Sequence, residues 1–248
     1  MYPELLKIGP LSIKSFGVML LLGFGVAIYW MAREGEKEGI KRELIFDFGL
    51  AAIITSLIGA RLIFVLLNLE EYFSDPLSIF LPRGGGLGGF SLHGGILGGA
   101  LFVLFFAQKH QIHKGKLLDL CSPSLALGTA IGRIGCFLNG CCYGIPSNLP
   151  WAVKFPEVAE KVHPTQLYAS FFNLILFFGL LKIKKYRKFD GWLSLVYLIG
   201  YSSFRFILEI FRRGATAKIV LFSLTQAQLL SIFIIITAAL VIILHKPR

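Results

Sequence analysis

Residues 132–144 read Gly132-Arg133-Ile134-Gly135-Cys136-Phe137-Leu138-Asn139-Gly140-Cys141-Cys142-Tyr143-Gly144. Arg133 lies just inside the end of an apolar run, and an arginine at membrane depth is costly unless anionic or polar groups meet it. The glycines carry no Cβ, so a ligand or another helix can approach the backbone closely. The stretch therefore predicts a functional site at the end of a transmembrane helix.

The composition is that of a membrane protein. Of the 248 residues, 55% are hydrophobic and only 16% are charged, which predicts a polytopic membrane protein rather than a soluble domain. The net charge of +11 does not indicate a nucleic-acid partner, because the basic residues are dispersed between apolar segments. We interpret them as topology signals and as contacts to anionic membrane lipids.

Seven apolar segments are long enough, or nearly so, to cross a bilayer, which takes about 20 residues per helix. They are residues 16–31, 44–67, 92–107, 117–138, 165–181, 192–208 and 226–244. We therefore predict an all-α polytopic membrane protein, built as a single seven-helix domain over residues 1–248. The longest outer loop, about 145–164, contains several prolines and is expected to form a small cap at the membrane surface.

The distribution of Lys and Arg predicts the orientation. The loops after the first, third and fifth predicted helices, together with the C-terminal tail, carry more Lys and Arg than the opposite side. Because cytoplasmic loops are enriched in these residues, the N-terminus is expected outside and the C-terminus in the cytoplasm.

Three arginines, Arg61, Arg133 and Arg205, lie within predicted spans. Each falls in the last third of an outward-running helix, so all three are expected in the outer half of the bilayer. They could snorkel to the interface or pair internally, for example Arg205 with Glu209 one helical turn away. They could instead form an anion clamp, because guanidinium groups bind phosphate through a planar fork of donors.

His93 and the cysteines allow more than one interpretation. His93 stands between two glycine clusters at the start of a predicted helix and could be structural, or could accept a thiol or hydroxyl proton. Cys136, Cys141 and Cys142 have C-x4-C-C spacing, which differs from the C-x2-C pairs usual at zinc sites. A disulfide, a reactive thiol and simple packing all remain open for them.

Four segments taken together resemble one family, the prolipoprotein diacylglyceryl transferases. They are His93-Gly94-Gly95, the 132–144 stretch, His163-Pro164-Thr165-Gln166-Leu167-Tyr168, and the run from Gly200-Tyr201 through Phe204-Arg205 and Glu209 to Arg212. The resemblance covers most of the chain in order.

The resemblance implies that the protein transfers diacylglyceryl from phosphatidylglycerol to the lipobox cysteine thiol of a prolipoprotein signal peptide in the bacterial cytoplasmic membrane. It implies catalytic roles for His93, Arg133 and Arg205, with the arginines holding the lipid phosphate. Substrate-binding roles are expected for a further set, Arg61, Gly94, Gly95, Asn139, Gly144 and Glu209. No metal or other cofactor is expected.

This chain departs from the usual family pattern at several positions. Cys136 stands where the family usually has Asn, Cys141 where it has Glu, Phe16 where it has Tyr, and Ala169 where it has an acidic residue. A related transferase with another acceptor, or a lipid-binding or transport protein without chemistry, therefore remain alternatives.

Overall fold

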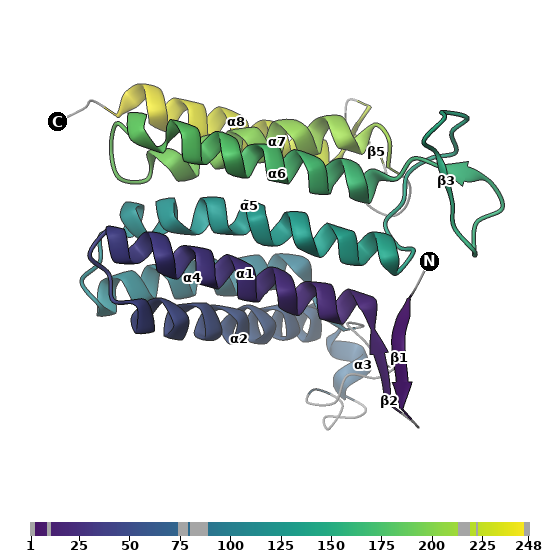
Figure 1. Cartoon of the computed structure of the whole chain (residues 1–248), viewed down its shortest axis with the longest axis horizontal. Coiled ribbons are helices and arrows are strands. Elements are labelled where there is room, and N and C mark those ends of the chain that lie inside the picture. The colour runs from purple at the N-terminus through teal and green to yellow at the C-terminus, as the bar shows by residue number, and fades with distance from the viewer. Residues whose placement is uncertain are drawn as a thin grey trace. The chain divides into compact units, whose positions relative to one another are not determined.

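Long α-helices dominate the computed structural model, which describes residues 3–8, 11–73, 79, 89–212, 219–221 and 223–245 (Figure 1). Within those ranges the long helices are α1 (Ser15–Lys37), α2 (Arg42–Leu67), α4 (Leu92–Lys109), α5 (Lys114–Leu138), α6 (Thr165–Ile183), α7 (Trp192–Glu209) and α8 (Gln226–Leu244). The remaining helical segments are short, α3 (Leu69–Phe73) and the 3-10 turn η2 (Lys184–Tyr186).

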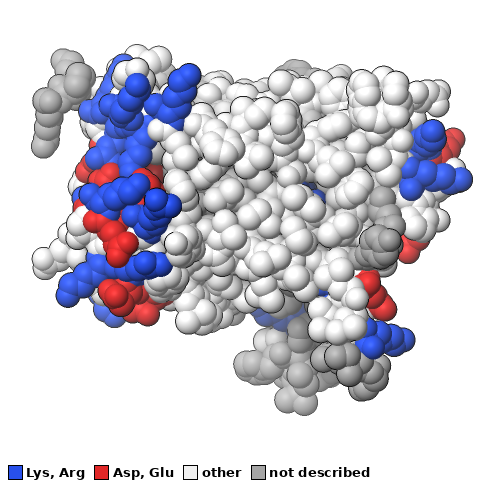
Figure 2. Space-filling view, in the orientation of Figure 1, with Lys and Arg blue, Asp and Glu red and all other residues white. Residues whose placement is uncertain are grey.

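Six of these helices are long and apolar enough to cross a membrane: α1, α2, α4, α5, α6 with its following turn, and α8. Their outward side chains are apolar, as Leu21 (72% exposed), Phe171 (67%) and Ile243 (75%) illustrate. Figure 2 shows Lys, Arg, Asp and Glu concentrated near helix ends, while the helix sides are largely uncharged. The prediction of an all-α, multi-pass membrane protein is confirmed; the orientation stays a prediction.

Helix α7 is the seventh predicted span and differs from the other six. It has 18 residues and includes Arg205 and Glu209, whose charges lower its mean hydropathy. Its polar residues are compatible with a membrane environment because α7 packs against α6 and α8, and Phe204 stacks on Phe172 of α6 with ring centroids 4.0 Å apart.

The chain divides into two compact units, one of Met1–Met31 with Leu118–Arg248 and one of Ala32–Leu117. In the first unit, α1 and α5 approach closely where Gly23 faces the backbone of Gly128. In the second unit, α2 and α4 approach closely where Gly59 faces Gly94 and Gly98. Small residues four apart, such as Gly94 and Gly98, permit such contacts between helices.

Short antiparallel strand pairs lie outside the long helices. The pairs are β1 (Glu4–Ile8) with β2 (Leu11–Lys14), β3 (Val153–Lys154) with β4 (Lys161–Val162), and β5 (Ile219–Leu221) with β6 (Leu224–Thr225). The β3–β4 pair falls within residues 145–164, the segment expected to form a surface cap.

Candidate functional site

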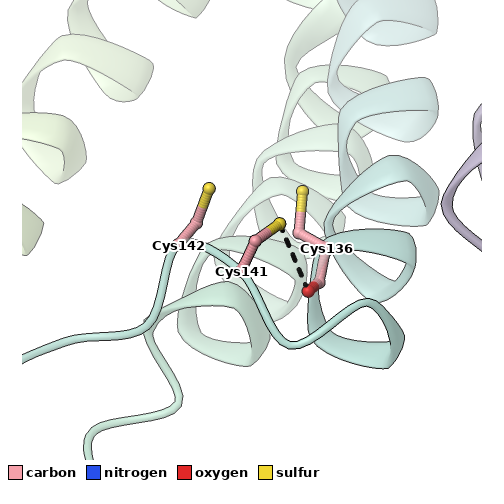
Figure 3. A group of neighbouring side chains, drawn as sticks. All are labelled: Cys136, Cys141 and Cys142. Carbon is pink, nitrogen blue, oxygen red and sulfur yellow. Dashed lines mark hydrogen bonds between the residues drawn. The ribbon is translucent and has the colours of Figure 1, made fainter. Parts of the chain in front are cut away.

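Helix α5 ends in a Schellman motif that brings two cysteines together. Gly140 has a left-handed φ of 73°, its N–H donates to Phe137 O at 3.1 Å, and the Cys141 N–H donates to Cys136 O at 3.1 Å. In this motif the residue after the left-handed glycine packs against the last helical turn. The C-x4-C spacing therefore places Cys141 beside Cys136, and its thiol also donates to Cys136 O at 3.6 Å (Figure 3).

Cys142 completes a cluster of three thiols. Its φ of 65° is left-handed, a conformation that non-glycine residues rarely adopt. The sulfur atoms of Cys136, Cys141 and Cys142 all lie within 4.8 Å of one another, and all three cysteines are free thiols. Cys136 is buried and Cys142 is exposed, so the cluster is open on one side.

The first turn of α6 holds the cysteine loop in place. Thr165 Oγ1 donates to Cys142 O at 2.8 Å, and Gln166 Nε2 donates to Cys141 O at 2.7 Å. Both polar side chains are at least 98% buried, so these hydrogen bonds form away from water. The loop geometry after α5 is therefore determined jointly by α5 and α6.

Arg133 of α5 and Arg212 just beyond α7 lie near the thiols, and Arg205 of α7 lies near Arg212. Burial lowers the pKa of Arg212, and the positive charges of Arg205 and Arg133 lower it further. The guanidinium groups of Arg133 and Arg205 therefore both lie within electrostatic range of Arg212. Like charges gathered in this way repel unless anions offset them.

Glu209 offsets part of this positive charge. Its Oε2 accepts from Arg205 Nη1 in an ion pair one helical turn apart, and its side chain is fully buried. The pairing of Arg205 with Glu209 that the spacing predicts is thus present. Among the described residues, Glu209 Oε1 and Arg212 Nε are buried without a hydrogen-bond partner, so the cluster retains polar atoms able to contact a further group.

Gly144 lies where the loop after α5 meets the residues after α7. It forms an antiparallel bridge with Arg212, and its N–H donates to His163 O at 2.9 Å. A Cβ at Gly144 would collide with Phe211 O and would lie 2.8 Å from Thr165 Cγ2. Only glycine fits at this position. The bridge from Gly144 to Arg212 therefore joins the cysteine loop to the residues after α7. A direct contact between Gly144 and substrate stays a prediction.

Arg61 belongs to the second unit and contacts the segment before α4. Its Nε donates to Ile79 O at 2.9 Å and its Nη1 to Gly89 O at 2.8 Å. Its guanidinium also lies 5.3 Å from the ring centre of Tyr72 and 5.8 Å from that of Phe90. These contacts show that Arg61 organises the start of α4; its expected role in substrate binding stays a prediction.

His93 and the adjacent glycines occupy the first turn of α4, also in the second unit. Ser91 caps this helix by accepting from Gly94 N at 3.4 Å. His93 is exposed, so its ring can be reached from solvent. Gly94 is buried against Gly59 of α2, so it has a packing role whether or not it also contacts substrate. A Cβ atom added to Gly95 would lie 3.5 Å from Ala60 Cβ, an ordinary contact distance.

The Cys142 thiol has unusual acidity. Its pKa lies well below its ordinary value because its sulfur interacts with the neighbouring Cys136 and Cys141 thiols, and the positive charges of Arg133 and Arg212 add to the effect. A thiolate is the nucleophilic and metal-binding form of cysteine. The cluster thus stabilises negative charge on sulfur.

Comparison with known proteins agrees with the resemblance in the motifs. A model of the family "Prolipoprotein diacylglyceryl transferase" matches residues 3–244. The chain belongs to this family. A phosphatidylglycerol–prolipoprotein diacylglyceryl transferase of Clostridium tetani is 33% identical over 100% of this chain and 99% of that protein. A like-named protein of Pseudoalteromonas translucida is 35% identical over 94% of this chain and 89% of its own length.

Three of the positions at which the sequence is expected to depart from the family pattern lie near the end of α5 or beside it. Cys136 and Cys141 are two members of the thiol cluster. Phe16 of α1 lies beside Gly135, whose ideal Cβ would be 3.4 Å from Phe16 Cα. Cys136 and Cys141 are therefore neighbours in space, and Phe16 lies beside Gly135, the residue that precedes Cys136.

The predicted site residues fall in both units. The first unit contains Arg133, Asn139, Gly144, Arg205 and Glu209, and the second contains Arg61, His93, Gly94 and Gly95. Arg212, Thr165 and Gln166 belong to segments that carry the family resemblance, but the sequence does not predict their contacts with the cysteine loop and the arginines. For Arg212 a signal exists, since spacings of four and seven residues place Arg205, Glu209 and Arg212 on one helical face. Thr165 and Gln166 act on cysteine carbonyl groups, which no sequence spacing reveals.

Proposed function

We propose that this membrane transferase moves the diacylglyceryl group of phosphatidylglycerol to the thiol of the lipobox cysteine in a prolipoprotein, and releases glycerol 1-phosphate. The named relatives support phosphatidylglycerol and prolipoprotein as substrates. Their bacterial origin supports the cytoplasmic membrane as the location. The single observation that carries the proposal is the grouping of Arg133 and Arg205 around Arg212, with Glu209 paired to Arg205.

The arginine cluster suits a phosphodiester. Two or three guanidinium forks can bind the phosphoryl oxygens through charge-assisted hydrogen bonds. The buried, unpartnered Nε of Arg212 supplies one donor. Glu209 fixes the orientation of Arg205 through their ion pair, which makes it a positioning residue in this proposal.

The reaction is a displacement at a glyceryl carbon. The thiolate sulfur of the prolipoprotein forms a bond to that carbon as the carbon–oxygen bond to phosphate breaks. The bonding pair leaves with the oxygen, so negative charge develops on the departing glycerol phosphate. Fixed guanidinium groups stabilise the charge that appears in the transition state, and the thiol proton ends on the phosphate or in solvent.

His93 is the proposed proton acceptor for the incoming thiol. A neutral imidazole can accept a thiol proton on its unprotonated ring nitrogen. The exposure of His93 at the first turn of α4 supports this role. Asn139, whose side chain interacts with Cys141, is proposed to organise the polar end of α5.

The test is a reconstitution of the purified protein in vesicles that contain labelled phosphatidylglycerol, with a lipobox peptide added. We expect thioether-linked diacylglyceryl peptide and an equal amount of glycerol phosphate. Arg133→Ala and Arg205→Ala should each reduce the rate by about 100-fold or more, since each removes a group that meets developing charge.

A matched control is Arg33→Ala, which removes an exposed arginine near the end of α1 and should leave the rate unchanged. Glycerol phosphate release that needs a nucleophile other than the peptide thiol would favour the alternative acceptor. Binding of phosphatidylglycerol with no product from the parent protein would reject the transferase proposal.

A further inference from the structure

The thiol cluster at the end of α5 has no role in the proposed transfer, which uses the thiol of the prolipoprotein. Cys136 is 9% exposed, Cys141 is partly exposed and Cys142 is exposed. Figure 3 shows the three sulfur atoms on the same side of the backbone that carries them. Packing alone does not require three sulfurs to converge in this way.

We propose that Cys136, Cys141 and Cys142 form a binding site for a thiophilic metal cation of the Zn²⁺ class. Their sulfur atoms lie within 4.8 Å of one another. Zn²⁺ binds thiolates at about 2.3 Å, which separates the sulfurs of a tetrahedral site by about 3.8 Å. A convergence of about 1 Å, within the reach of χ1 adjustments, would therefore bring all three onto one ion.

The unusual spacing of the ligands has a structural explanation. Zinc sites commonly use C-x2-C pairs, whereas this chain has C-x4-C followed directly by a third cysteine. The Schellman motif folds the chain back at Gly140, so that Cys141 returns to Cys136. The left-handed backbone of Cys142 then turns its side chain to the same side.

The supporting shell is built from buried hydrogen bonds. Thr165 and Gln166 hold the carbonyl groups of Cys142 and Cys141. Groups that fix the position of metal ligands affect metal affinity by about 10- to 100-fold. The ligand backbone is therefore positioned before any ion binds, which lowers the conformational cost of binding.

The charge balance favours a cation bound by thiolates. Arg133 interacts electrostatically with Cys136 and Cys142, and Arg212 interacts with Cys142. Three thiolates and one divalent cation carry a net charge of −1, which these arginines can offset. Soft thiolate ligands select Zn²⁺ or Cu⁺ over Mg²⁺ and Ca²⁺. Three protein ligands leave one coordination position open on the exposed side.

The test uses the full chain, purified in detergent without a histidine tag, under a non-thiol reductant that keeps the cysteines reduced. The protein is dialysed against Zn²⁺, bound metal is measured by elemental analysis, and the ligands are identified by X-ray absorption at the zinc edge. We expect one Zn²⁺ per chain, with sulfur ligands at about 2.3 Å.

Four variants make the result specific. Cys142→Ser and Cys141→Ser should weaken Zn²⁺ binding by at least about 100-fold, since each removes one ligand. Gln166→Ala should weaken it by about 10-fold or more while all three thiols remain. Cys121→Ser removes the buried cysteine elsewhere on α5 and should bind as the parent does. Thermal unfolding of each variant confirms that it is folded.

No bound Zn²⁺ in the reduced parent would overturn the proposal. Retention of binding in both Cys142→Ser and Cys141→Ser, or a zinc environment without sulfur, would also overturn it. The measurement contains neither lipid nor peptide, so its outcome is independent of whether the transferase assay succeeds.

Discussion

A Cβ atom on Gly59 would lie 2.5 Å from the carbonyl oxygen of Gly94, across the contact between α2 and α4. The same atom would lie 3.0 Å from Gly98 Cα. The obstacles are backbone atoms of a regular helix, which cannot rotate away as a flexible side chain can. An added methyl group must therefore push the two helices apart, and close-packed interiors transmit that strain.

Gly59→Ala is accordingly expected to lower the free energy of unfolding by about 1–3 kcal/mol, the usual cost of overpacking. The matched control is Gly25→Ala on α1, because an added Cβ there meets nothing within 4 Å and alanine is the better helix former. Thermal unfolding in detergent measures both. Equal melting temperatures for the two variants would contradict the packing argument.

Glu209 provides a test of the arginine cluster. Its buried side chain is paired with Arg205, so Glu209→Ala leaves Arg205 unoriented and the cluster more positive. We expect kcat of the diacylglyceryl transfer to fall by about 10- to 100-fold, an effect typical of a lost positioning contact. Glu209→Gln keeps the shape but not the charge, and should retain more activity than the alanine variant.

The readout for Glu209 is the separation of kcat from KM for phosphatidylglycerol. Loss of orientation lowers kcat, whereas a purely structural defect lowers the amount of folded protein and leaves both constants of the folded fraction unchanged. A Glu209→Ala protein with normal kcat per folded molecule would show that Glu209 does not position Arg205.

Hydropathy predicts where the helices lie more accurately than where they end. Residues 226–244 were expected to form a span and α8 is Gln226–Leu244. For the first helix the expected span, 16–31, ends before α1, which continues to Lys37. Hydropathy identifies only the apolar part of a helix, which lies in the lipid. Backbone hydrogen bonds can extend the same helix beyond that part into water. The two-residue and three-residue strands are too short to show periodicity.

The candidate site was only partly accessible to sequence reasoning. The pairing of Arg205 with Glu209 follows from helical spacing, a local rule. The approach of Arg133 and Arg212 to this pair depends on how α5 and α7 pack. Spacing within one helix does not predict that packing. Standard zinc spacings do not predict the approach of Cys141 to Cys136, because it depends on the helix-ending turn at Gly140.

The reactivity of Cys142 should differ from that of an ordinary cysteine. Because its pKa is lowered, its thiolate persists at pH values where an ordinary thiol, with a pKa of about 8.5, is protonated. Alkylation of Cys142 by iodoacetamide should therefore stay nearly constant from pH 8 to pH 6.5, while an ordinary thiol slows by about tenfold for each pH unit in this range.

Peptide mass mapping after timed alkylation measures this reactivity. Arg212→Ala should steepen the pH dependence, because it removes one of the charges that stabilise the thiolate. Cys121 is buried and serves as the internal unreactive reference. A Cys142 rate that falls tenfold for each unit of pH in the parent protein would show that its pKa is ordinary.

Asp119 of α5 determines where α7 begins. Its Oδ2 accepts from Gly191 N and its Oδ1 from Ser194 N, each at 2.9 Å, so a buried carboxylate satisfies two N–H groups at the α7 N-terminus. A negative charge is favourable there because of the helix dipole. Asp119→Ala is expected to cost about 1–3 kcal/mol of stability, since buried donors lose their partners.

Asp119→Asn keeps one acceptor oxygen and should lose less stability than Asp119→Ala. Arg187 lies 3.9 Å from Asp119 Oδ2 and 3.4 Å from Asp190 Oδ1. Asp190→Ala is the comparison, because Asp190 is about one-third exposed, and such pairs contribute about 0–1 kcal/mol. Thermal unfolding gives the ranking, and faster hydrogen exchange at the Ser194 amide locates the defect at the α7 N-terminus. If Asp119→Ala unfolds no earlier than Asp190→Ala, the carboxylate does not anchor α7, and the position of Arg205 on that helix must depend on its packing against α6 and α8 alone.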